Sequence, residues 1–468
     1  MTSERSSHSA SQEAQPGAPP RPAAGTRATP WSEAQAERHL RSLELFGMRF
    51  GLDRMRRMMT ALGSPQRRFD TIHVLGTNGK SSSTRMIAAI LERHGLRTGA
   101  YTSPHLVSYT ERVQVAERDL DSDAFAAAVA RAAWAAERVN RTLSEDDHVT
   151  QFELLTAAAL WEMAERGVEV AVLEAGLGGR YDATSVVESR LTVLTNVGLE
   201  HTRWLGPTLK DIAEEKLAVV QPETTLVLGA DLEPAALEVA GRVAGERGAQ
   251  IVQVSAGDES VPLLARGSFQ QRNFALARAA AEAYLKDPGR LHRERPGIGW
   301  EGEAHERAVR DAAASTAVPG RLQLVEGEPL TVFDGAHNPH AIAALVESLP
   351  EVLLGRPTAM VLGVLEDKDA AGMLAALLGV CERAWFTAPP SSRALSPAAL
   401  QSLARQLSFD AVACEPTPWR ALQEARRWAA GRGGAVLVTG SVYLVGDLLS
   451  RLPAGERLSG PQASSVAS

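Results

Sequence analysis

A lysine followed by three serines stands where a strand pattern turns into a helix pattern. Residues 71–85 read TIHVLGTNGKSSSTR: an apolar, β-branched stretch, a loop with Gly76 and Gly79, and helical spacing from Lys80 onward. The loop N–H groups and the helix N-terminus then converge on one point. There the Lys80 ammonium favours a polyphosphate, and a serine hydroxyl can ligate its Mg²⁺. The loop is therefore predicted to bind a nucleotide.

The spacing of this loop differs from the usual phosphate-loop pattern. The first glycine of that pattern would fall at Val74, so the loop has the compact form G-x-x-G-K-S. An ordinary strand-to-helix turn is the alternative interpretation, and it leaves Lys80 and the serines without a purpose. We therefore favour the phosphate site.

Two further side chains that can do chemistry follow other predicted strands. Strand 168–173 ends in Glu174, ahead of a cluster of glycines, and strand 191–195 leads to His201. Because ligands of parallel sheets bind outside the carboxyl ends of the strands, Lys80, Glu174 and His201 are expected at one sheet edge. An isolated Glu or His in such loops is more often an exposed polar residue or a helix cap. The shared edge favours Mg²⁺ ligation instead.

Lys216 falls inside the apolar stripe of a predicted helix. The stripe of TLKDIAEEKLAVV runs through Leu209, Ile212, Ala213 and Val220, and Lys216 lies within it at helical spacing. Spacing alone favours a lysine that extends from the edge of the stripe to water. The alternative is a desolvated amine with a lowered pKa near the metal site. Such an amine could react with CO₂ to give a carbamate, which is a negative oxygen ligand.

The elements that would position these residues alternate between strands and helices. This alternation indicates an α/β fold with a parallel sheet covered on both faces. Strands are predicted at 71–75, 97–101, 168–173, 191–195, 225–229 and 250–254, and helices at 80–94, 122–139, 151–166, 208–220 and 233–247.

A second, smaller α/β domain is predicted after a stretch punctuated by Pro and Gly near residues 286–300, which is followed by a charged, Ala-rich surface helix. The alternation restarts after Arg321, with strands near 330–334, 358–362, 383–387, 410–414 and 435–438. The predicted domains are thus 31–320 and 321–452. Disordered extensions are expected at 1–30 and 453–468.

Composition restricts the possible partners. The chain has 468 residues, a net charge of −7 and no block of Lys or Arg, so nucleic acid and anionic membranes are poor candidate partners. The two cysteines, Cys381 and Cys414, lie far apart and indicate neither a disulfide framework nor a zinc site. The longest uncharged apolar run, 433–446, is too short to span a membrane. A cytoplasmic protein is expected.

Short motifs along the chain identify a family by resemblance. In order, they read HVLGTNGKSS, YTSPHL, LEAGLGGRYDAT, LEHTRWLG, EEK, PGRLQ, DGAHNPH, LGVLEDKD and VTGSVYLVG. They resemble the folylpolyglutamate synthase and dihydrofolate synthase family, which belongs to the Mur ligase group of ATP-dependent amide-forming enzymes. The resemblance extends from about Leu40 to Leu452. It implies an N-terminal Mur-type P-loop ATPase domain and a C-terminal Rossmann-like domain, with the active site in the cleft between them.

The resemblance also implies roles for individual residues. Lys216 matches the carbamylated lysine of the family, and His337 lies in the motif that the family places near the incoming glutamate. The family usually has glycine where this chain has Ser81, which leaves open whether Ser81 or Ser82 supplies the loop hydroxyl. The remaining residues match ATP contacts (Gly76, Thr77, Asn78, Gly79, Lys80, Ser81, Ser82, Asn273, Arg321 and Asp334), magnesium ligands (Ser103, Glu174 and His201) and pterin contacts (Thr150, Gln151, Phe152, Glu153, Arg180, Tyr181 and Asp182).

The implied activity is ATP-dependent ligation of L-glutamate through an acyl phosphate, with Lys80, Lys216 and His337 as catalytic residues. Dihydropteroate is one implied acceptor, and reduced folates that become polyglutamates are the other. ATP and two Mg²⁺ ions are implied, and a monomer is expected. One alternative is a Mur-type ligase on a cell-wall nucleotide precursor, against which the RYD and TQFE segments argue. The other is a nucleotide-gated folate-binding protein without turnover, against which the intact set of candidate catalytic residues argues.

Overall fold

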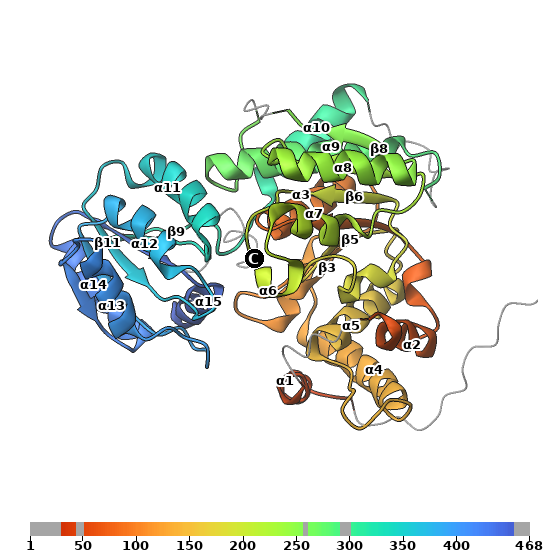
Figure 1. Ribbon diagram of the computed structural model, residues 1–468, viewed down its shortest axis with the longest axis horizontal. Coiled ribbons are helices and arrows are strands. Elements are labelled where there is room, and N and C mark those ends of the chain that lie inside the picture. Colours follow the sequence, from red (N-terminus) through yellow and green to blue (C-terminus); the bar gives the residue numbers. More distant parts are fainter. Residues whose placement is uncertain (1–29, 44–50, 256–260, 291–300, 454–468) are drawn as a thin grey trace, which may run out of the picture.

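The chain forms two α/β lobes that lie side by side, each built on its own sheet (Figure 1). The computed structural model describes residues 30–43, 51–255, 261–290 and 301–453. The apolar core of the N-terminal lobe continues to Val318, and that of the C-terminal lobe begins at Leu322. The predicted extensions lie outside the described residues, apart from residues 30 and 453.

The N-terminal sheet has eight strands in the order β4-β3-β2-β5-β1-β6-β7-β8. The run from β2 to β8 is parallel, whereas β3 and β4 pair antiparallel at one edge. Each strand predicted for this lobe is present. The bounds are β1 Asp70–Leu75, β2 Thr98–Tyr101, β3 Val113–Val115, β4 Arg118–Asp119, β5 Val170–Glu174, β6 Leu191–Leu194, β7 Thr225–Leu228 and β8 Gln250–Gln253.

Helices cover both faces of this sheet because strand side chains point alternately to either side. Ile72 and Val74 of β1 pack with α3, α9 and α10 on one face, whereas Leu75 packs with α7 and α8 on the other. On that second face α1, α2, α4 and α5 cover the β2 side of the sheet. The helices are α1 Glu33–Ser42, α2 Asp53–Ala61, α3 Lys80–Arg93, α4 Ser122–Asn140, α5 Gln151–Glu165, α6 Thr202–Leu205, α7 Leu209–Leu217, α8 Pro234–Arg247, α9 Ser268–Lys286 and α10 Gly302–Ser315, with 3-10 turns η1 Pro65–Arg67, η2 Tyr109–Arg112 and η3 Ala183–Val186.

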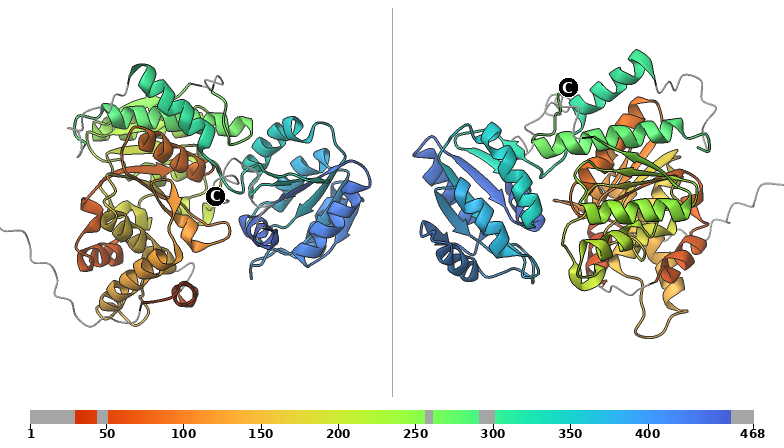
Figure 2. Two further views of the ribbon diagram at one scale, coloured as in Figure 1. Left: turned by 180° about the vertical axis from the view of Figure 1, so that it is seen from behind. Right: turned by 45° about the horizontal axis from the view of Figure 1, so that its top comes forward.

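The C-terminal lobe repeats this construction on a smaller scale (Figure 2). Its six strands are ordered β13-β12-β11-β14-β10-β9, all parallel except β9. Helices α11 to α13 cover one face, and α14 and α15 the other. The elements are β9 Gln323–Val325, β10 Leu330–Phe333, α11 Pro339–Leu353, β11 Thr358–Leu362, α12 Ala370–Leu377, η4 Leu378–Val380, β12 Arg383–Phe386, α13 Pro397–Gln406, β13 Val412–Cys414, α14 Pro418–Ala430, β14 Ala435–Thr439 and α15 Val442–Arg451.

Two features differ from the expectations. The antiparallel strands β3, β4 and β9 were not predicted, since a strand-helix alternation gives no signal for short edge strands. The Ala-rich piece near residue 305 forms the predicted helix, α10, but it is not a free surface helix: His305, Val309 and Ala312 are buried. Its small side chains permit close packing on α3. Among the described residues, no helix is long and apolar enough to cross a membrane.

Candidate active site

Two adjoining cavities lie where the carboxyl ends of the N-terminal strands face the C-terminal lobe. One, of about 410 Å³, surrounds the loop after β1, and the other, of about 330 Å³, lies against the start of α5. Residues of both lobes line each cavity. The two share one wall, formed by Ser103, Pro104, Gly176, His201 and His337. A ligand in one cavity can therefore meet a ligand in the other at this wall.

The loop after β1 has the backbone of a phosphate site. Gly79 precedes α3 with a φ of +82°, and the first residues of the helix line the larger cavity. Because no side chain caps the helix, its first N–H groups can bind an anion there. A Cβ at this glycine would lie 2.4 Å from the Asn273 side-chain oxygen. Lys80 lines the same cavity and folds back to donate to the Thr77 carbonyl at 3.0 Å. Thr77, Asn78, Gly79, Lys80, Ser81 and Ser82 all line this cavity, and Gly76 lies behind them.

Glu174 ends β5 beside this loop. Its carboxylate accepts hydrogen bonds from the Ser81 hydroxyl at 2.7 Å and the Ser103 backbone N–H at 3.0 Å. Burial raises the pKa of Glu174, and the charge of Lys80 and these two hydrogen bonds oppose the rise. Ser81 thus faces the candidate metal ligand directly, while Ser82 also lines the cavity. The predicted neighbours Lys80, Glu174 and His201 share this sheet edge.

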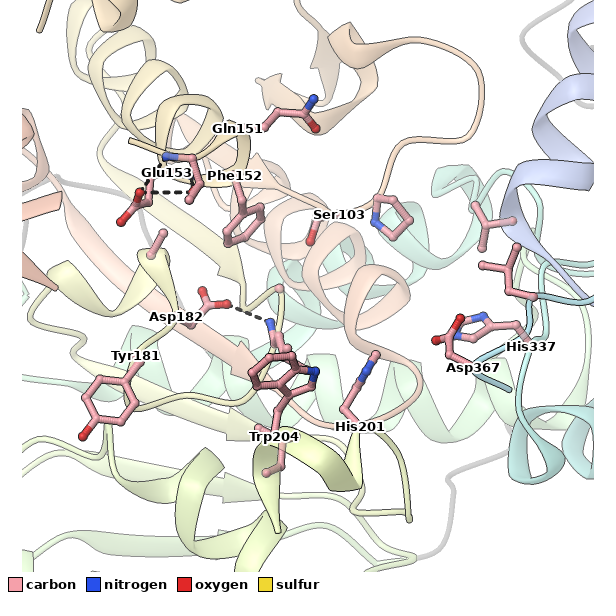
Figure 3. A pocket seen from close by; sticks show the side chains of 18 of the residues that line it. Ser103, Gln151, Phe152, Glu153, Tyr181, Asp182, His201, Trp204, His337 and Asp367 are labelled. Carbon is pink, nitrogen blue, oxygen red and sulfur yellow. Dashed lines mark hydrogen bonds between the residues drawn. The ribbon is translucent and has the colours of Figure 1, made fainter. Parts of the chain in front are cut away.

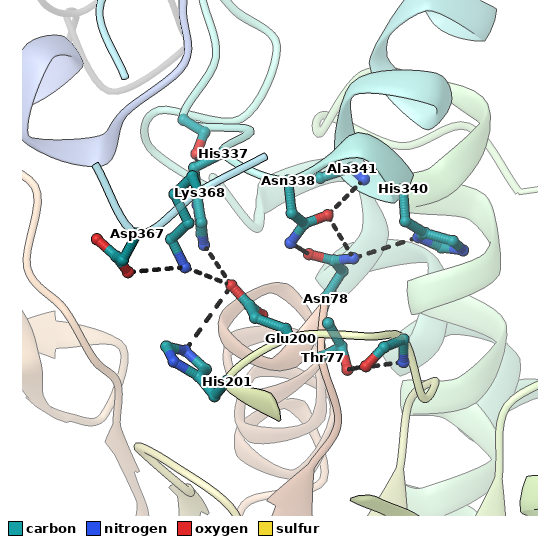
Figure 4. Close-up of polar contacts among 12 residues, drawn as sticks. Thr77, Asn78, Glu200, His201, His337, Asn338, His340, Ala341, Asp367 and Lys368 are labelled. Atoms are coloured by element: carbon teal, nitrogen blue, oxygen red, sulfur yellow. Dashed lines mark hydrogen bonds and ion pairs between the residues drawn. The ribbon is translucent and has the colours of Figure 1, made fainter. Parts of the chain in front are cut away.

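His201 and Glu200 follow β6 and meet the C-terminal lobe (Figure 4). The Glu200 carboxylate lies 2.7 Å from Lys368 Nζ and 3.3 Å from His337 Nε2, both across the cleft. Burial opposes its ionisation, but the hydrogen bond from His337 and the charge of Lys368 hold the pKa of Glu200 well below its usual range. Burial lowers the pKa of His201 to about 4, so its imidazole is neutral and can ligate a metal.

Lys216 lies inside the protein, as the second interpretation of its spacing requires. It is 5% exposed, and its ammonium donates to the Gly76 carbonyl at 2.8 Å. Burial, followed by the charge of Lys80, lowers its pKa to about 7. A small cavity joins Lys216 to Lys80, Glu200 and His201. The amine is therefore held at the metal edge of the sheet with a substantial neutral fraction at physiological pH.

Aromatic side chains and two buried carboxylates, those of Glu153 and Asp182, line the smaller cavity (Figure 3). The Phe152 ring lies below Gly176, where an added Cβ would come within 2.5 Å of it. Asp182 is buried, and burial raises its pKa against the hydrogen bonds that it accepts from Thr184 and the Leu177 N–H. Tyr181 lines the cavity and is half exposed. A flat apolar ring with polar edges would find both a stacking surface and an acceptor here.

Not all predicted pterin contacts point into this cavity. Thr150 and Glu153 line it, yet they cap α5 reciprocally, and the Glu153 carboxylate also pairs with Arg54 at 3.0 Å. Gln151 donates to the Leu40 carbonyl at 2.8 Å. Arg180 instead forms an ion pair with Glu215 at 3.2 Å. Thr150, Gln151 and Glu153 therefore shape the cavity wall more than they offer free polar groups, and Arg180 does not line the cavity.

The C-terminal lobe and α9 complete the larger cavity. Asn273, Arg321 and Asp334 line it, as the resemblance implies. The Asp334 carboxylate accepts hydrogen bonds from the N–H groups of Leu322 and Ala336, each at 2.8 Å. The first bond holds the beginning of the C-terminal lobe beside Asp334. Asn273 donates to the side chain of the fully buried Gln270 at 3.0 Å. The side-chain oxygen of Asn273 is thereby turned toward Gly79.

Several lining residues were not singled out from the sequence. Glu200 and Lys368 stand inside quoted motifs, and Glu200 directly precedes His201, which was assigned. The charge of both residues could have indicated them. Arg54 precedes the resemblance motifs and has no local signal. The others of this kind are Arg112, Trp204, Asp367, Arg393 and Tyr443, which line the smaller cavity.

The residues at the sheet edge fit a hard cation in part. Glu174 offers a carboxylate, His201 a neutral imidazole, and Ser81, Ser82 and Ser103 hydroxyls. Among the described residues, no three His, Cys, Asp or Glu side chains are grouped so as to hold a metal ion. A Mg²⁺ ion here would take its further oxygen ligands from phosphates and water, which is its usual mode in nucleotide sites.

Comparisons with known proteins agree with this geometry. The Mur ligase middle domain matches residues 74–272, and the Mur ligase glutamate ligase domain matches residues 320–442. The chain is 32% identical over 451 residues to the Escherichia coli dihydrofolate synthase/folylpolyglutamate synthase, covering 92% of this chain and 97% of that one.

Solved structures are similar over almost the whole chain. Mycobacterium tuberculosis folylpolyglutamate synthase complexed with ADP has a TM-score of 0.80 at 29% identity, covering 89% of this chain and 97% of that chain. E. coli FolC in complex with DHPP and ADP has a TM-score of 0.76 at 31% identity, covering 90% and 97%. A bifunctional folylpolyglutamate synthase/dihydrofolate synthase with Mn, AMPPNP and L-glutamate bound has a TM-score of 0.73 at 28% identity, covering 90% and 98%. The chain therefore belongs to the dihydrofolate synthase/folylpolyglutamate synthase family of Mur ligases.

Proposed function

We propose that this protein is an ATP-dependent ligase that joins L-glutamate to dihydropteroate and, in a second reaction, to tetrahydrofolate and its polyglutamates. The observation that carries this proposal is the common wall of the two cavities. A nucleotide in the larger cavity and a pterin in the smaller one would meet at Ser103, Gly176 and His201. The family relationship supplies the identity of the substrates.

The first step is phosphoryl transfer to the acceptor. An oxygen of the pteroate or folate carboxylate attacks the γ-phosphorus of ATP, the bond to ADP breaks, and an acyl phosphate forms. Lys80 and the N–H groups at the start of α3 stabilise the negative charge that develops on the transferred group. The acceptor carboxylate approaches past the shared wall, with its ring held between Phe152 and Asp182.

The second step forms the amide. The amino group of glutamate attacks the acyl carbon, phosphate leaves, and the amine loses its proton. His337 and Lys368 lie on the C-terminal side of the smaller cavity, where this amino acid enters. Since both lobes line the cavities, their closure keeps water from the acyl phosphate, which would otherwise hydrolyse.

We assign the metal and lysine roles as follows. Ser103, Glu174, His201 and a loop serine hold Mg²⁺, which neutralises charge on the phosphates when it is bound. The Ser81 hydroxyl already lies beside the Glu174 carboxylate, which makes Ser81 the better candidate for a direct hydroxyl ligand. Lys216 is carbamylated and supplies an oxygen ligand for a second Mg²⁺. Its burial and its pKa of about 7 support this assignment.

We further propose that residues 31–320 and 321–452 are the two functional domains and that the protein acts as a cytoplasmic monomer. The test of the substrate assignment is mass spectrometry of the products. With ATP, Mg²⁺ and glutamate, dihydropteroate should gain one glutamyl residue, and tetrahydrofolate should gain one or more. Product formation with dihydropteroate but not with tetrahydrofolate would show that the enzyme catalyses dihydrofolate synthesis only. No product from either would refute the proposal.

A further inference from the structure

The loop from Ser103 to Ser108 connects β2 to η2 and reaches out of the N-terminal lobe into the C-terminal one. Leu106 at its centre packs against the apolar cluster beneath α14 and α15, which includes Phe333, Leu444 and Val445. Leu106 also contacts the short segment between the two lobes: a Cβ at Gly320 would lie 2.9 Å from the Leu106 side chain. Leu106 of the N-terminal lobe thus takes part in the core of the other lobe.

The backbone of this loop touches α15 at a glycine. A Cβ at Gly446 would lie 1.8 Å from the Leu106 carbonyl oxygen and 2.8 Å from its carbon. Backbone cannot move aside as a flexible side chain does, so any residue larger than glycine would force the two segments apart. The close approach requires Gly446 although its position in mid-helix favours alanine by about 1 kcal/mol.

Within the N-terminal lobe, hydrogen bonds to one carboxylate hold the loop in place. The Glu111 carboxylate accepts from three consecutive backbone N–H groups of the loop, those of Leu106 at 2.8 Å, Val107 at 2.9 Å and Ser108 at 2.8 Å. Backbone hydrogen bonds to a carboxylate are strong, because one partner is charged. A displacement of Leu106 is therefore passed along the loop rather than absorbed by it.

The other end of the loop belongs to the active site. Ser103 and Pro104 line both cavities, and the Ser103 N–H donates to the Glu174 carboxylate at 3.0 Å. Only Pro104 and His105 separate Ser103 from Leu106. The position of Leu106 in the C-terminal lobe thus determines where the shared wall stands relative to the phosphate loop.

We propose that Leu106 and Gly446 form an interlobe seat and that both are positioning residues for the ligase reaction. Neither lies in contact with the reacting atoms. The seat couples the placement of the C-terminal lobe, which brings glutamate, to the placement of Ser103 and Glu174, which hold the metal and phosphates. Its effect on catalysis rests on the proposed function, whereas the mechanical coupling does not.

The test approaches the seat from both lobes. Gly446→Ala blocks the close approach and Leu106→Ala empties the seat, while Leu106→Met keeps a similar apolar volume. Gly379→Ala is the control in the C-terminal lobe, since a Cβ there meets nothing within 4 Å. Val107→Ala is the control within the loop, because Val107 is 43% exposed and keeps its N–H bond to Glu111.

The first readout is hydrogen exchange followed by mass spectrometry, which needs no substrate. In Gly446→Ala, peptides covering residues 98–112 in the other lobe should exchange several-fold faster than in Gly379→Ala, at unchanged melting temperature. Leu106→Ala should do the same to peptides of α15. If exchange changes only in the lobe that carries the substitution, the seat is not a coupling device.

The second readout is the kinetics of glutamate ligation. We expect Gly446→Ala and Leu106→Ala each to lower kcat about 10-fold or more and to raise KM for glutamate, with Leu106→Met restoring most of the loss. The effects of the two substitutions should not add in the double variant, because both displace the same loop residue. Variants with kcat and KM within two-fold of their controls would overturn the proposal. An inactive parent enzyme with normal exchange coupling would instead refute the proposed function alone.

Discussion

At the scale of single residues, burial sets the charges of the site. Burial lowers the pKa of Lys216, and partial desolvation at the cavity wall lowers the pKa of His201. Glu200 stays ionised through its contacts with His337 and Lys368. An amine that is partly neutral near pH 7 can react with CO₂, and a neutral imidazole can bind a metal. The groups with unusual protonation states thus lie at the positions where the proposed chemistry requires them.

Lys216→Ala should lose most of the activity, because the carbamate oxygen that we assign to a second Mg²⁺ disappears. A short carboxylic acid such as acetate or propionate, added to the assay, should restore part of it by occupying the vacated space and offering a carboxylate. The measurement is the ligation rate against the concentration of the acid, with Lys210→Ala as the exposed control. Full activity of Lys216→Ala without any acid would contradict the assignment.

The lowered pKa of Lys216 also predicts how stability depends on pH. In the unfolded chain the amine keeps its proton up to about its usual pKa of 10.5, whereas in the folded protein it releases it near 7. Between these values the unfolded state binds more protons, so this residue makes the free energy of unfolding rise with pH, by at most about 1.4 kcal/mol per unit.

Denaturant unfolding in CO₂-free buffer at pH 6.5, 7.5 and 8.5 would test this pH dependence. Lys216→Met removes the buried amine and should lose that part of the rise. The variant should therefore gain stability relative to the parent protein, most at pH 6.5 and least at pH 8.5. Lys210→Met, at an exposed lysine, should follow the parent. A pH-independent difference between Lys216→Met and the parent would show that the amine does not titrate in this range.

At the scale of elements, hydrophobic periodicity predicted most of the fold. The central parallel strands, such as β1, β5 and β6, are buried along their whole length, and such strands read as continuous apolar runs. The short edge strands β3, β4 and β9 have no such run. Arg54 on α2 could not be assigned either, because its partners Asp147 and Glu153 lie more than 90 residues away in the sequence and only the fold joins them.

This Arg54 pair gives a prediction for the helical layer of the smaller cavity. Arg54→Met should destabilise the protein by about 3 kcal/mol or more, because it leaves the buried Glu153 carboxylate without its partner. The measurement is the free energy of unfolding in urea. Arg57→Met is the matched control on the same helix, since Arg57 is exposed and bonds only to the Thr142 hydroxyl among the described residues. Equal losses in the two variants would contradict the role of the buried pair.

At the scale of the whole molecule, the active site exists only where the two lobes meet. Asn78 of the phosphate loop exchanges hydrogen bonds with Asn338, which caps α11, and Glu200 holds Lys368 and His337. The motifs that contain these residues identified the family and the cleft. The pairs themselves were not predictable, since they join residues 137 to 260 positions apart and depend on how the lobes are set.

Glu200→Gln should therefore weaken the ionic contact between the lobes. It leaves the Lys368 ammonium and the His337 ring without their common anion, and truncating one partner of a buried charge pair costs about 2 kcal/mol or more. We expect kcat/KM for glutamate to fall about 30-fold, at a similar melting temperature. Glu366→Gln, at an exposed carboxylate two residues before Lys368, should stay within two-fold of the parent. Equal values for the two variants would exclude Glu200 from this role.

The central claim is that one cleft activates a pterin carboxylate with ATP and transfers it to glutamate. The most direct measurement is ADP release by the purified protein with Mg²⁺, in the presence of dihydropteroate, glutamate, both or neither. The account predicts sustained release only with both substrates, one glutamyl product per ADP, and a loss of about 100-fold or more in Lys80→Ala, whose phosphate counter-charge is gone. ADP release that needs neither substrate, or that survives unchanged in Lys80→Ala, would contradict it.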